Sequence, residues 1–371
     1  MTDRRKPVVV VGAGPVGLVL AAELSRRGLP VRIVDGARGP EDRAAAEHLL
    51  LLPPTLAILK PSGLIERLIA EGQTIGAVAI DRDGRRAGTL SLSHMCAAFP
   101  FALSIDRARA ERVLIASLEG RGITVEWNTR LVELGETHRP TAILSTGEHV
   151  DSDAVVGCDG GDSTVRDILG LPWVETGPAI EYAMADVEMP AGANAEALTL
   201  SLRKSGAAQW LVETGQGRAR LIAIANAHDE PAYDIDGLGS PLDVSYCSCT
   251  PRHAERLARG RIFFAGGAGH VHSPFGFDAI GCGIADAAWL AFLLKTGRAS
   301  EYEMQRLPAI KRVQKRNRML VSRITGPSSA IGVLLRLGLP MAGAVPAIGK
   351  PLLTRLIGTG EPQPEWLRDG A

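Results

Sequence analysis

The sequence predicts an α/β protein with a parallel sheet, a smaller antiparallel sheet and a C-terminal helical region. Val8–Val11 is an apolar run without a polar break, as in a strand buried on both faces of a parallel sheet. Between Pro172 and Thr250, segments such as LTLSL, AQWLVE and RLIAIA are typical of an antiparallel sheet with one face toward a cavity. From about Glu301 onward, the remaining chain indicates helices.

The first elements follow one another as strand, turn, helix and strand. After Val8–Val11, the stretch Leu18–Arg27 is rich in Ala and Leu, and Gly28 stands at the position where a helix ends. Val31–Val34 then forms a second apolar strand that ends at Asp35. This order is that of a Rossmann-like βαβ unit.

Three glycines in the first turn have the G-x-G-x-x-G spacing of a dinucleotide site. Gly12 permits the tight turn, Gly14 lets a pyrophosphate approach the backbone, and Gly17 lets helix and strand pack closely. The helix N-terminus supplies N–H groups and partial positive charge to phosphates. Asp35 can accept hydrogen bonds from ribose hydroxyls.

Length and composition narrow the class of protein. The 371 residues are enough for two closely joined domains, and 41 basic residues balance 41 acidic ones, so charge predicts no nucleic-acid partner. The N-terminal MTDRRK runs directly into the first strand, and charges and prolines interrupt the apolar region Ile331–Ile357. We therefore expect no signal peptide and no transmembrane segment. The five cysteines include no C-x-x-C pair, which favours reduced thiols and a cytoplasmic protein.

Other elements are predicted along the chain. Ala44–Leu52 has a helix-like composition, and Asp83–Gly84 marks a hairpin turn. Ala154–Cys158 and Arg261–Phe264 are buried strands, each followed by a glycine turn. Ile284–Lys295 is predicted to be the helix behind the second of these turns.

Three ordered motifs give the chain its resemblance to a known family. The first is the glycine fingerprint with Asp35, the second is GCDGGDSTVR (Gly157–Arg166), and the third is the long run Gly260–Leu294. Arg107 falls where relatives carry a Gln or Arg facing the cofactor. Over nearly its whole length, the chain resembles the single-component FAD-dependent monooxygenases of the aromatic hydroxylase type.

The resemblance implies a discontinuous FAD-binding domain, a β-sheet substrate domain and C-terminal helices. The FAD-binding domain would comprise 1–75, 101–170 and 251–300, the substrate domain 76–100 and 171–250, and the helices 301–371. The residues implied to bind FAD are Gly12, Gly14, Pro15, Gly17, Asp35, Arg107, Asp159, Gly160, Gly267, Pro274, Gly276 and Gly283.

The third motif departs from the family pattern. Gly267 stands where relatives carry an Asp that holds the ribityl chain of FAD. Phe277 and Ala279 replace glycines of the loop that wraps the flavin ring, and Gly281 replaces an Asn. A side chain at such a position is a steric objection to ring contact, and Asp278 would add negative charge near the flavin. The flavin loop is therefore interpreted as eroded, with FAD weakly bound, structural or lost.

The sequence is compatible with three functions. In the family, NAD(P)H reduces FAD, and the reduced flavin uses oxygen to hydroxylate or epoxidise a substrate. The first hypothesis is such a monooxygenase acting on a bulky apolar, polyketide-like molecule. The second is a redox-neutral cyclase on the same scaffold, which would act by orienting its substrate. The third is a non-catalytic small-molecule-binding protein.

No side chain is singled out as catalytic, because the flavin would carry the chemistry. His270 and His272 form an H-x-H pair, but without a third ligand at suitable spacing we expect no metal site. Candidates for substrate contact are Trp210, Phe275, Phe277 and Asp278. The oligomeric state is not predicted.

Overall fold

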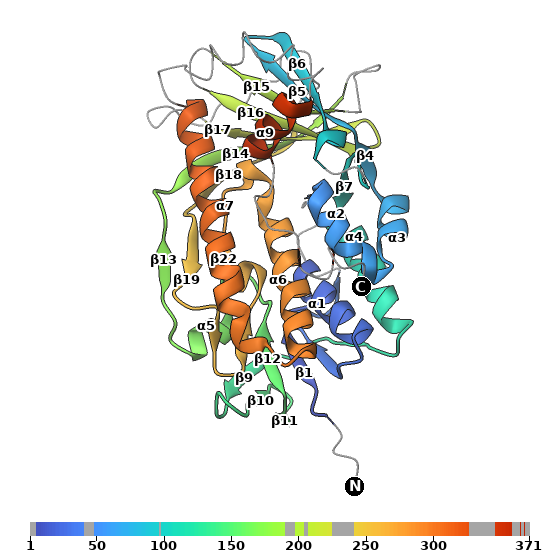
Figure 1. The fold of residues 1–371 in the computed structure, drawn as a ribbon, viewed down its shortest axis with the longest axis vertical. Coiled ribbons are helices and arrows are strands. Elements are labelled where there is room, and N and C mark those ends of the chain that lie inside the picture. The colour runs from blue at the N-terminus through green and yellow to red at the C-terminus, as the bar shows by residue number, and fades with distance from the viewer. Residues whose placement is uncertain are drawn as a thin grey trace.

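A computed structural model of the chain describes residues 5–40, 48–95, 98–189, 197–203, 207–224, 241–325 and 346–357, together with Pro364 and Leu367. Two sheets lie at opposite ends of the long axis, and the long helices α6 and α7 run between them (Figure 1).

The first sheet is Rossmann-like and has six strands. Five neighbouring strands are parallel, and only the edge strand β20 is antiparallel. Val8–Val11 lies at its centre with every residue buried, as its apolar run predicts. In spatial order the strands are β20 (Ala258–Arg259), β21 (Ile262–Phe264), β12 (Ala154–Gly157), β1 (Val8–Val11), β2 (Val31–Val34) and β8 (Val125–Glu126).

Helices rich in Ala and Leu pack around this sheet. Helix α1 contacts both α4 and α6, and its residues join the largest hydrophobic cluster. The helices of this part are α1 (Pro15–Arg26), α2 (Pro53–Leu59), α3 (Ile65–Glu71), α4 (Arg107–Glu119), α5 (Thr164–Ile168) and α6 (Asp278–Lys295).

The second large sheet has seven strands and carries its own core on one face. All its pairings are antiparallel except that of β15 with β5, which attaches the β5–β6 hairpin. In spatial order its strands are β18 (Pro241–Cys249), β14 (Ile180–Glu188), β17 (Arg218–Ile224), β16 (Ala208–Gly215), β15 (Ala197–Leu202), β5 (Ala77–Arg82) and β6 (Arg85–Ser91).

Three small sheets complete the strands of the described residues. They are β9 (Leu131–Leu134) with β10 (Thr141–Leu144) and β11 (His149–Asp151); β3 (His48–Leu51) with β7 (Ala102–Asp106) and β4 (Gln73–Ile75); and β13 (Trp173–Glu175) with β19 (Arg252–Ala254) and β22 (His270–Val271).

Two C-terminal helices connect the two large sheets. Helix α7 (Tyr302–Thr325) runs beside α6, and α9 (Pro346–Leu356) lies against its far end at the seven-stranded sheet (Figure 1). None of the helices in the described ranges combines the length and the apolar character that crossing a membrane requires.

The predicted fold class is confirmed, and two element predictions need correction. Residues 48–51 of the expected helix Ala44–Leu52 form strand β3, because they pair with β7, whereas 44–47 lie outside the described residues. Helix α6 begins at Asp278, six residues before the expected Ile284, although Gly281 and Gly283 lower its intrinsic helix propensity. The hairpin at Asp83–Gly84 is confirmed, and both residues have positive φ angles.

Candidate cofactor and active site

A cavity of about 890 Å³ opens at the carboxyl ends of the parallel strands. Its walls include the β1–α1 turn, the residues after β2, the turn after β12 and the residues around β22. In open α/β sheets, ligands bind at this edge, where adjacent connections diverge. A volume of this size is typical of a cofactor or drug-sized ligand.

The β1–α1 turn requires glycine at two positions. Gly12 has a φ angle of +104°, and a Cβ atom on it would lie 2.5 Å from the carbonyl oxygen of Cys158. A Cβ atom on Gly17 would lie 1.9 Å from the carbonyl oxygen of Gly12. Gly14 caps α1, and Pro15 begins it. The turn therefore presents backbone to the cavity at a helix N-terminus, which suits a pyrophosphate.

Asp35 ties the first turn to the end of β2. Its Oδ2 accepts a hydrogen bond of 2.6 Å from the Ala13 N–H, and its Oδ1 accepts one of 2.9 Å from the Ala37 N–H. Arg130 lines the same part of the cavity and packs against Gly36, where a Cβ atom would lie 2.7 Å from the Arg130 side chain. The carboxylate is thus oriented at the cavity wall.

Arg107 enters the cavity from the start of α4. Its Nε donates a hydrogen bond of 2.9 Å to Oε1 of Glu111, a carboxylate with 1 % side-chain exposure. This ion pair directs the guanidinium group along one wall.

Asp159 supplies a buried carboxylate without a full set of partners. Its Oδ2 accepts a hydrogen bond of 3.2 Å from the Val165 N–H, whereas its Oδ1 is buried without a partner among the described residues. Burial raises the pKa of Asp159 above its ordinary value. An unsatisfied buried acceptor in a cavity wall indicates a ligand donor.

The turn after β12 lies directly against Gly267. A Cβ atom on Gly267 would lie 3.1 Å from the Cα atom of Gly160 and 3.3 Å from the amide nitrogen of Gly161. The absence of a side chain at 267 therefore permits the close approach of these two backbones, both of which line the cavity.

A chain of four buried side chains begins beside this turn and was not predicted from the sequence. Asp286 accepts hydrogen bonds of 3.0 Å from the Gly266 N–H, 2.6 Å from Nε2 of His270 and 2.7 Å from Nε of Arg306. Desolvation opposes ionisation of Asp286, but the electrostatic attraction and the hydrogen bonds of the neighbouring His270 and Arg306 side chains prevail and lower its pKa. The carboxylate is therefore held ionised.

His272 ends this chain at the cavity. Its Nε2 lies 2.8 Å from Nδ1 of His270, and its own Nδ1 is buried without a hydrogen-bond partner among the described residues. Both imidazoles line the cavity. Burial and the neighbouring His270 lower the pKa of His272 well below its usual value, so its ring is neutral. Because His270 Nε2 donates to Asp286, a neutral His270 accepts at Nδ1, and His272 donates from Nε2.

Cys282 lies close enough to the two histidines for the three to be considered as metal ligands, within 4.8 Å. The geometry argues against a cation there. His270 uses both ring nitrogens in hydrogen bonds, and the Arg306 guanidinium lies 3.6 Å from the Cys282 sulfur. The expectation of no metal stays a prediction.

The flavin loop turns the Phe277 ring away from the cavity. Phe277 has a φ angle of +55°, a conformation that favours glycine, and its ring centroid lies 5.2 Å from that of Trp210. It is not among the residues that line the cavity, whereas Ala279 and Ile280 are. The steric objection thus applies to the Ala279 side chain rather than to the Phe277 ring.

The loop glycines serve packing rather than the cavity surface. A Cβ atom on Gly276, which follows Pro274 in a short 3₁₀ turn, would lie 2.4 Å from Oδ1 of Asn317, and one on Gly283 would lie 2.7 Å from the Val16 side chain. Neither glycine lines the cavity.

The predicted substrate candidates form an aromatic cluster behind this loop. Trp210 and Phe275 are completely buried, with ring centroids 6.0 Å apart. The Trp210 Nε1 has no hydrogen-bond partner among the described residues. The Asp278 side chain lies outside the described residues. Substrate contact by these residues stays a prediction.

Comparison with known proteins identifies the family. Residues 5–233 match the family described as "FAD binding domain". The chain is also 31% identical to 6-methylpretetramide 4-monooxygenase from Streptomyces rimosus, over 94% of this chain and 67% of that protein. The chain belongs to the FAD-dependent monooxygenases of the aromatic hydroxylase type.

Other proteins to which the chain is similar differ in their named reactions. Dialkyldecalin synthase from Streptomyces rugosporus is 27% identical over 77% of this chain and 64% of that protein. The crystal structure of p-nitrophenol 4-monooxygenase from Pseudomonas putida has a TM-score of 0.80 at 18% identity, covering 96% of this chain and 99% of that one, and shows the shared fold.

The cavity fits the cofactor of this family. The glycine turns provide close backbone approach, and the unpartnered Asp159 Oδ1 provides an acceptor for a ligand donor. Eight of the predicted residues line it, namely Gly12, Gly14, Pro15, Asp35, Arg107, Asp159, Gly160 and Gly267.

Two features of the cavity were not predicted from the sequence. Arg130 was missed because its position after β8 carries no motif. The histidine chain was missed because Asp286 and Arg306 come from different helices, although the H-x-H pair was a visible signal.

Proposed function

We propose that this chain is an FAD- and NAD(P)H-dependent monooxygenase that hydroxylates or epoxidises a bulky apolar, polyketide-like molecule. The observation that carries the proposal is the joining, in one cavity, of a dinucleotide cradle and the unpartnered nitrogen of His272. The relative that acts on 6-methylpretetramide supports a polycyclic substrate.

Each part of the cavity has a task in holding FAD. The β1–α1 turn and the α1 N-terminus would bind the pyrophosphate, and Asp35 would bind a ribose. Asp159 and the backbone at Gly267 would face the ribityl and flavin part. When bound, FAD supplies the redox chemistry, and the protein supplies binding, orientation and exclusion of water.

The histidine chain would manage a substrate proton. Nδ1 of neutral His272 can accept a proton from a substrate hydroxyl while Nε2 passes its proton to Nδ1 of His270. The positive charge then rests on His270, next to the ionised Asp286 and 2.6 Å from its Oδ2. This placement compensates for the low basicity of buried His272.

A spectrum of the purified protein tests the proposal. After FAD is added and excess is removed by desalting, we expect retained flavin absorption and NAD(P)H oxidation stimulated by a polycyclic phenol. His272→Asn should retain FAD but lose about 10²–10⁴-fold in kcat, the usual contribution of a general base. His149→Asn, a change at an exposed histidine, is the control. A protein that retains no flavin absorption after desalting would contradict the proposal.

A redox-neutral cyclase is the second candidate, favoured by one observation. Gly267 lacks the side chain expected to hold the ribityl group, and the Gly160–Gly161 backbone occupies the adjacent space. Dialkyldecalin synthase, which is similar to this chain, is named as a synthase and not as a monooxygenase. Conversion of a polyene substrate without oxygen or NAD(P)H would support this candidate, since orientation alone can accelerate cyclisation.

A further inference from the structure

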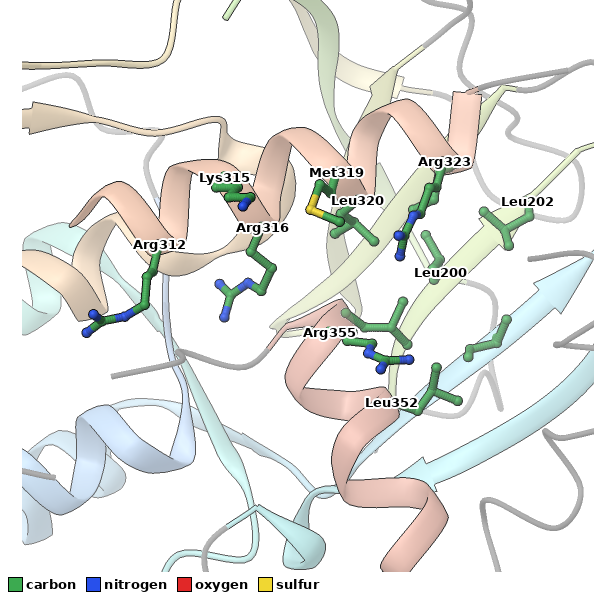
Figure 2. A pocket seen from close by; sticks show the side chains of 13 residues that line it. Leu200, Leu202, Arg312, Lys315, Arg316, Met319, Leu320, Arg323, Leu352 and Arg355 are labelled. Carbon is green, nitrogen blue, oxygen red and sulfur yellow. The ribbon is translucent and has the colours of Figure 1, made fainter. Parts of the chain in front are cut away.

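A second cavity of about 280 Å³ lies at the far end of α7. Its walls come from strands β5 and β15 and from helices α7 and α9 (Figure 2). We call it the cationic pocket. The residues that matter most to its chemistry are Ile80, Leu200, Leu320, Leu356, Arg323 and Arg355.

The floor of the cationic pocket is the apolar face of the seven-stranded sheet. Leu200 pairs directly with Ile80 on one side and with Trp210 on the other. Paired residues point to the same face of a sheet, so the pocket shares its floor with the aromatic cluster around Trp210. Leu320 and Leu356 close it from the two helices. The interior therefore suits a flat apolar body.

The rim of the pocket is positively charged. The Lys and Arg residues that line the pocket are Arg312, Lys315, Arg316, Arg323 and Arg355, and no acidic residue is among its lining residues, although the chain as a whole has no net charge. Arg323 of α7 and Arg355 of α9 extend into the space between the helices and β15 (Figure 2). Across the described ranges, neither guanidinium has a carboxylate within ion-pair distance. The rim therefore suits an anion.

We propose that the cationic pocket is a second ligand site, apart from the cofactor cavity, that binds a small molecule with an aromatic body and a carboxylate. The apolar cavity places the body, and Arg323 and Arg355 bind the carboxylate, for which the guanidinium fork is well suited. A nucleic-acid backbone would meet the arginines but leave the apolar floor unused.

Helix α7 connects the pocket to the cofactor cavity. Arg316 lines the pocket, and the adjacent Asn317 packs against Gly276 of the flavin loop. The aromatic cluster lies between the two cavities, because Trp210 shares the pocket floor and contacts Phe275 and Phe277. A ligand in the pocket is thus separated from the flavin loop by these side chains.

Binding of 9-anthracenecarboxylate, measured by fluorescence titration, tests the proposal. We expect binding by the FAD-loaded wild-type protein and at least tenfold weaker binding of the uncharged 9-anthracenemethanol. Arg323→Gln and Arg355→Gln should each weaken carboxylate binding by about tenfold, equivalent to about 1.4 kcal/mol. Lys311→Gln, which changes a cation of α7 that lines a different groove, should leave it unchanged.

Three results would overturn the proposal. They are equal binding of the acid and the alcohol, equal loss in Lys311→Gln, and no binding of the acid near 1 mM. A protein that instead sediments with phosphatidylglycerol vesicles, and loses this in Arg323→Gln, would show a membrane surface. FAD content, measured separately by absorbance, tests the proposed function. A protein that binds the carboxylate but does not retain FAD would contradict the proposed monooxygenase function and support the proposed ligand site.

Discussion

The two cavities of this protein are built in different ways. The cofactor cavity is bounded in large part by backbone at the glycine turns after β1 and β12, and each of these turns belongs to a short sequence motif. The cationic pocket is bounded by side chains from two strands and two helices that are distant in sequence. We infer that the first cavity depends on local chain geometry and the second on tertiary packing. Substitutions at the glycine turns should therefore lower stability as well as FAD binding, whereas substitutions in the cationic pocket should affect ligand binding alone.

The largest effect is expected at Asp286, the carboxylate shared by His270 and Arg306. Asp286→Asn should reduce the free energy of unfolding by about 3–5 kcal/mol, because it leaves a buried guanidinium uncompensated. Since the folded-state pKa of Asp286 is lowered, its contribution is present above about pH 4 and is lost as the pH falls through that folded value. Urea unfolding of the wild type and of Asp286→Asn at pH 7 measures the loss of stability, and the same comparison at pH 3 measures how much of the Asp286 contribution remains.

Asp151→Asn is the matched control for Asp286. Asp151 forms an ion pair with Lys6 at the surface, where solvent screens the interaction, so stability should be nearly unchanged. Equal losses in the two variants would contradict the interpretation of the buried chain.

A somewhat smaller loss is expected from Gly17→Ala. The new Cβ atom would overlap the Gly12 carbonyl oxygen, and relief requires a backbone shift in the first turn. We expect a loss of about 3 kcal/mol, together with weaker FAD binding, by thermal unfolding and absorbance titration. Gly76→Ala, where no atom lies within 4 Å of the new Cβ, should change neither. A Gly17→Ala variant as stable as wild type would show that the turn adapts.

The pH dependence of stability should report on His272. Because the pKa of His272 is far lower in the folded chain than in the unfolded chain, this imidazole binds a proton in the unfolded chain at a pH where it remains neutral in the folded chain. Wild-type stability should therefore decline as the pH falls below about 6.5, by up to about 1.4 kcal/mol per pH unit from this group. His272→Asn should flatten the decline between pH 7 and 5. An unchanged slope in His272→Asn would mean that the imidazole is protonated in the folded state.

The smallest effect on stability is expected in the cationic pocket. Arg323→Gln should change the free energy of unfolding by less than about 0.5 kcal/mol, since the side chain is exposed and surface changes are usually this small. Chemical denaturation can check this on the same samples used for ligand titration. A loss above about 1 kcal/mol would give the arginine a structural role and weaken the contrast between the cavities.

The sequence predicts well those parts whose conformation is decided within about thirty residues. The unit from Val8 to Asp35 is an example, because its strand, turn and helix each carry a local signal. Strand β3 is the opposite case, since His48–Leu51 becomes a strand only through pairing with β7, more than fifty residues away. Its residues alone favour a helix.

The candidate site shows the same division. Gly12, Asp35 and Asp159 lie in motifs, and the structure brings them to one cavity. The ion pair of Asp286 with Arg306 depends on the packing of α6 against α7, which no spacing rule predicts. The ring of Phe277 likewise takes its direction from Trp210, a residue of a strand far away in the sequence.

The contact between Gly276 and Asn317 has a consequence for how the protein could be altered. The Asn317 side chain occupies the volume that any larger residue at 276 would need, so a larger residue there would displace this side chain. The same helix forms a wall of the cationic pocket. A substitution at 276 made to reshape the flavin loop therefore also alters a side chain of the helix that carries Arg323, and both sites should be assayed in such a variant.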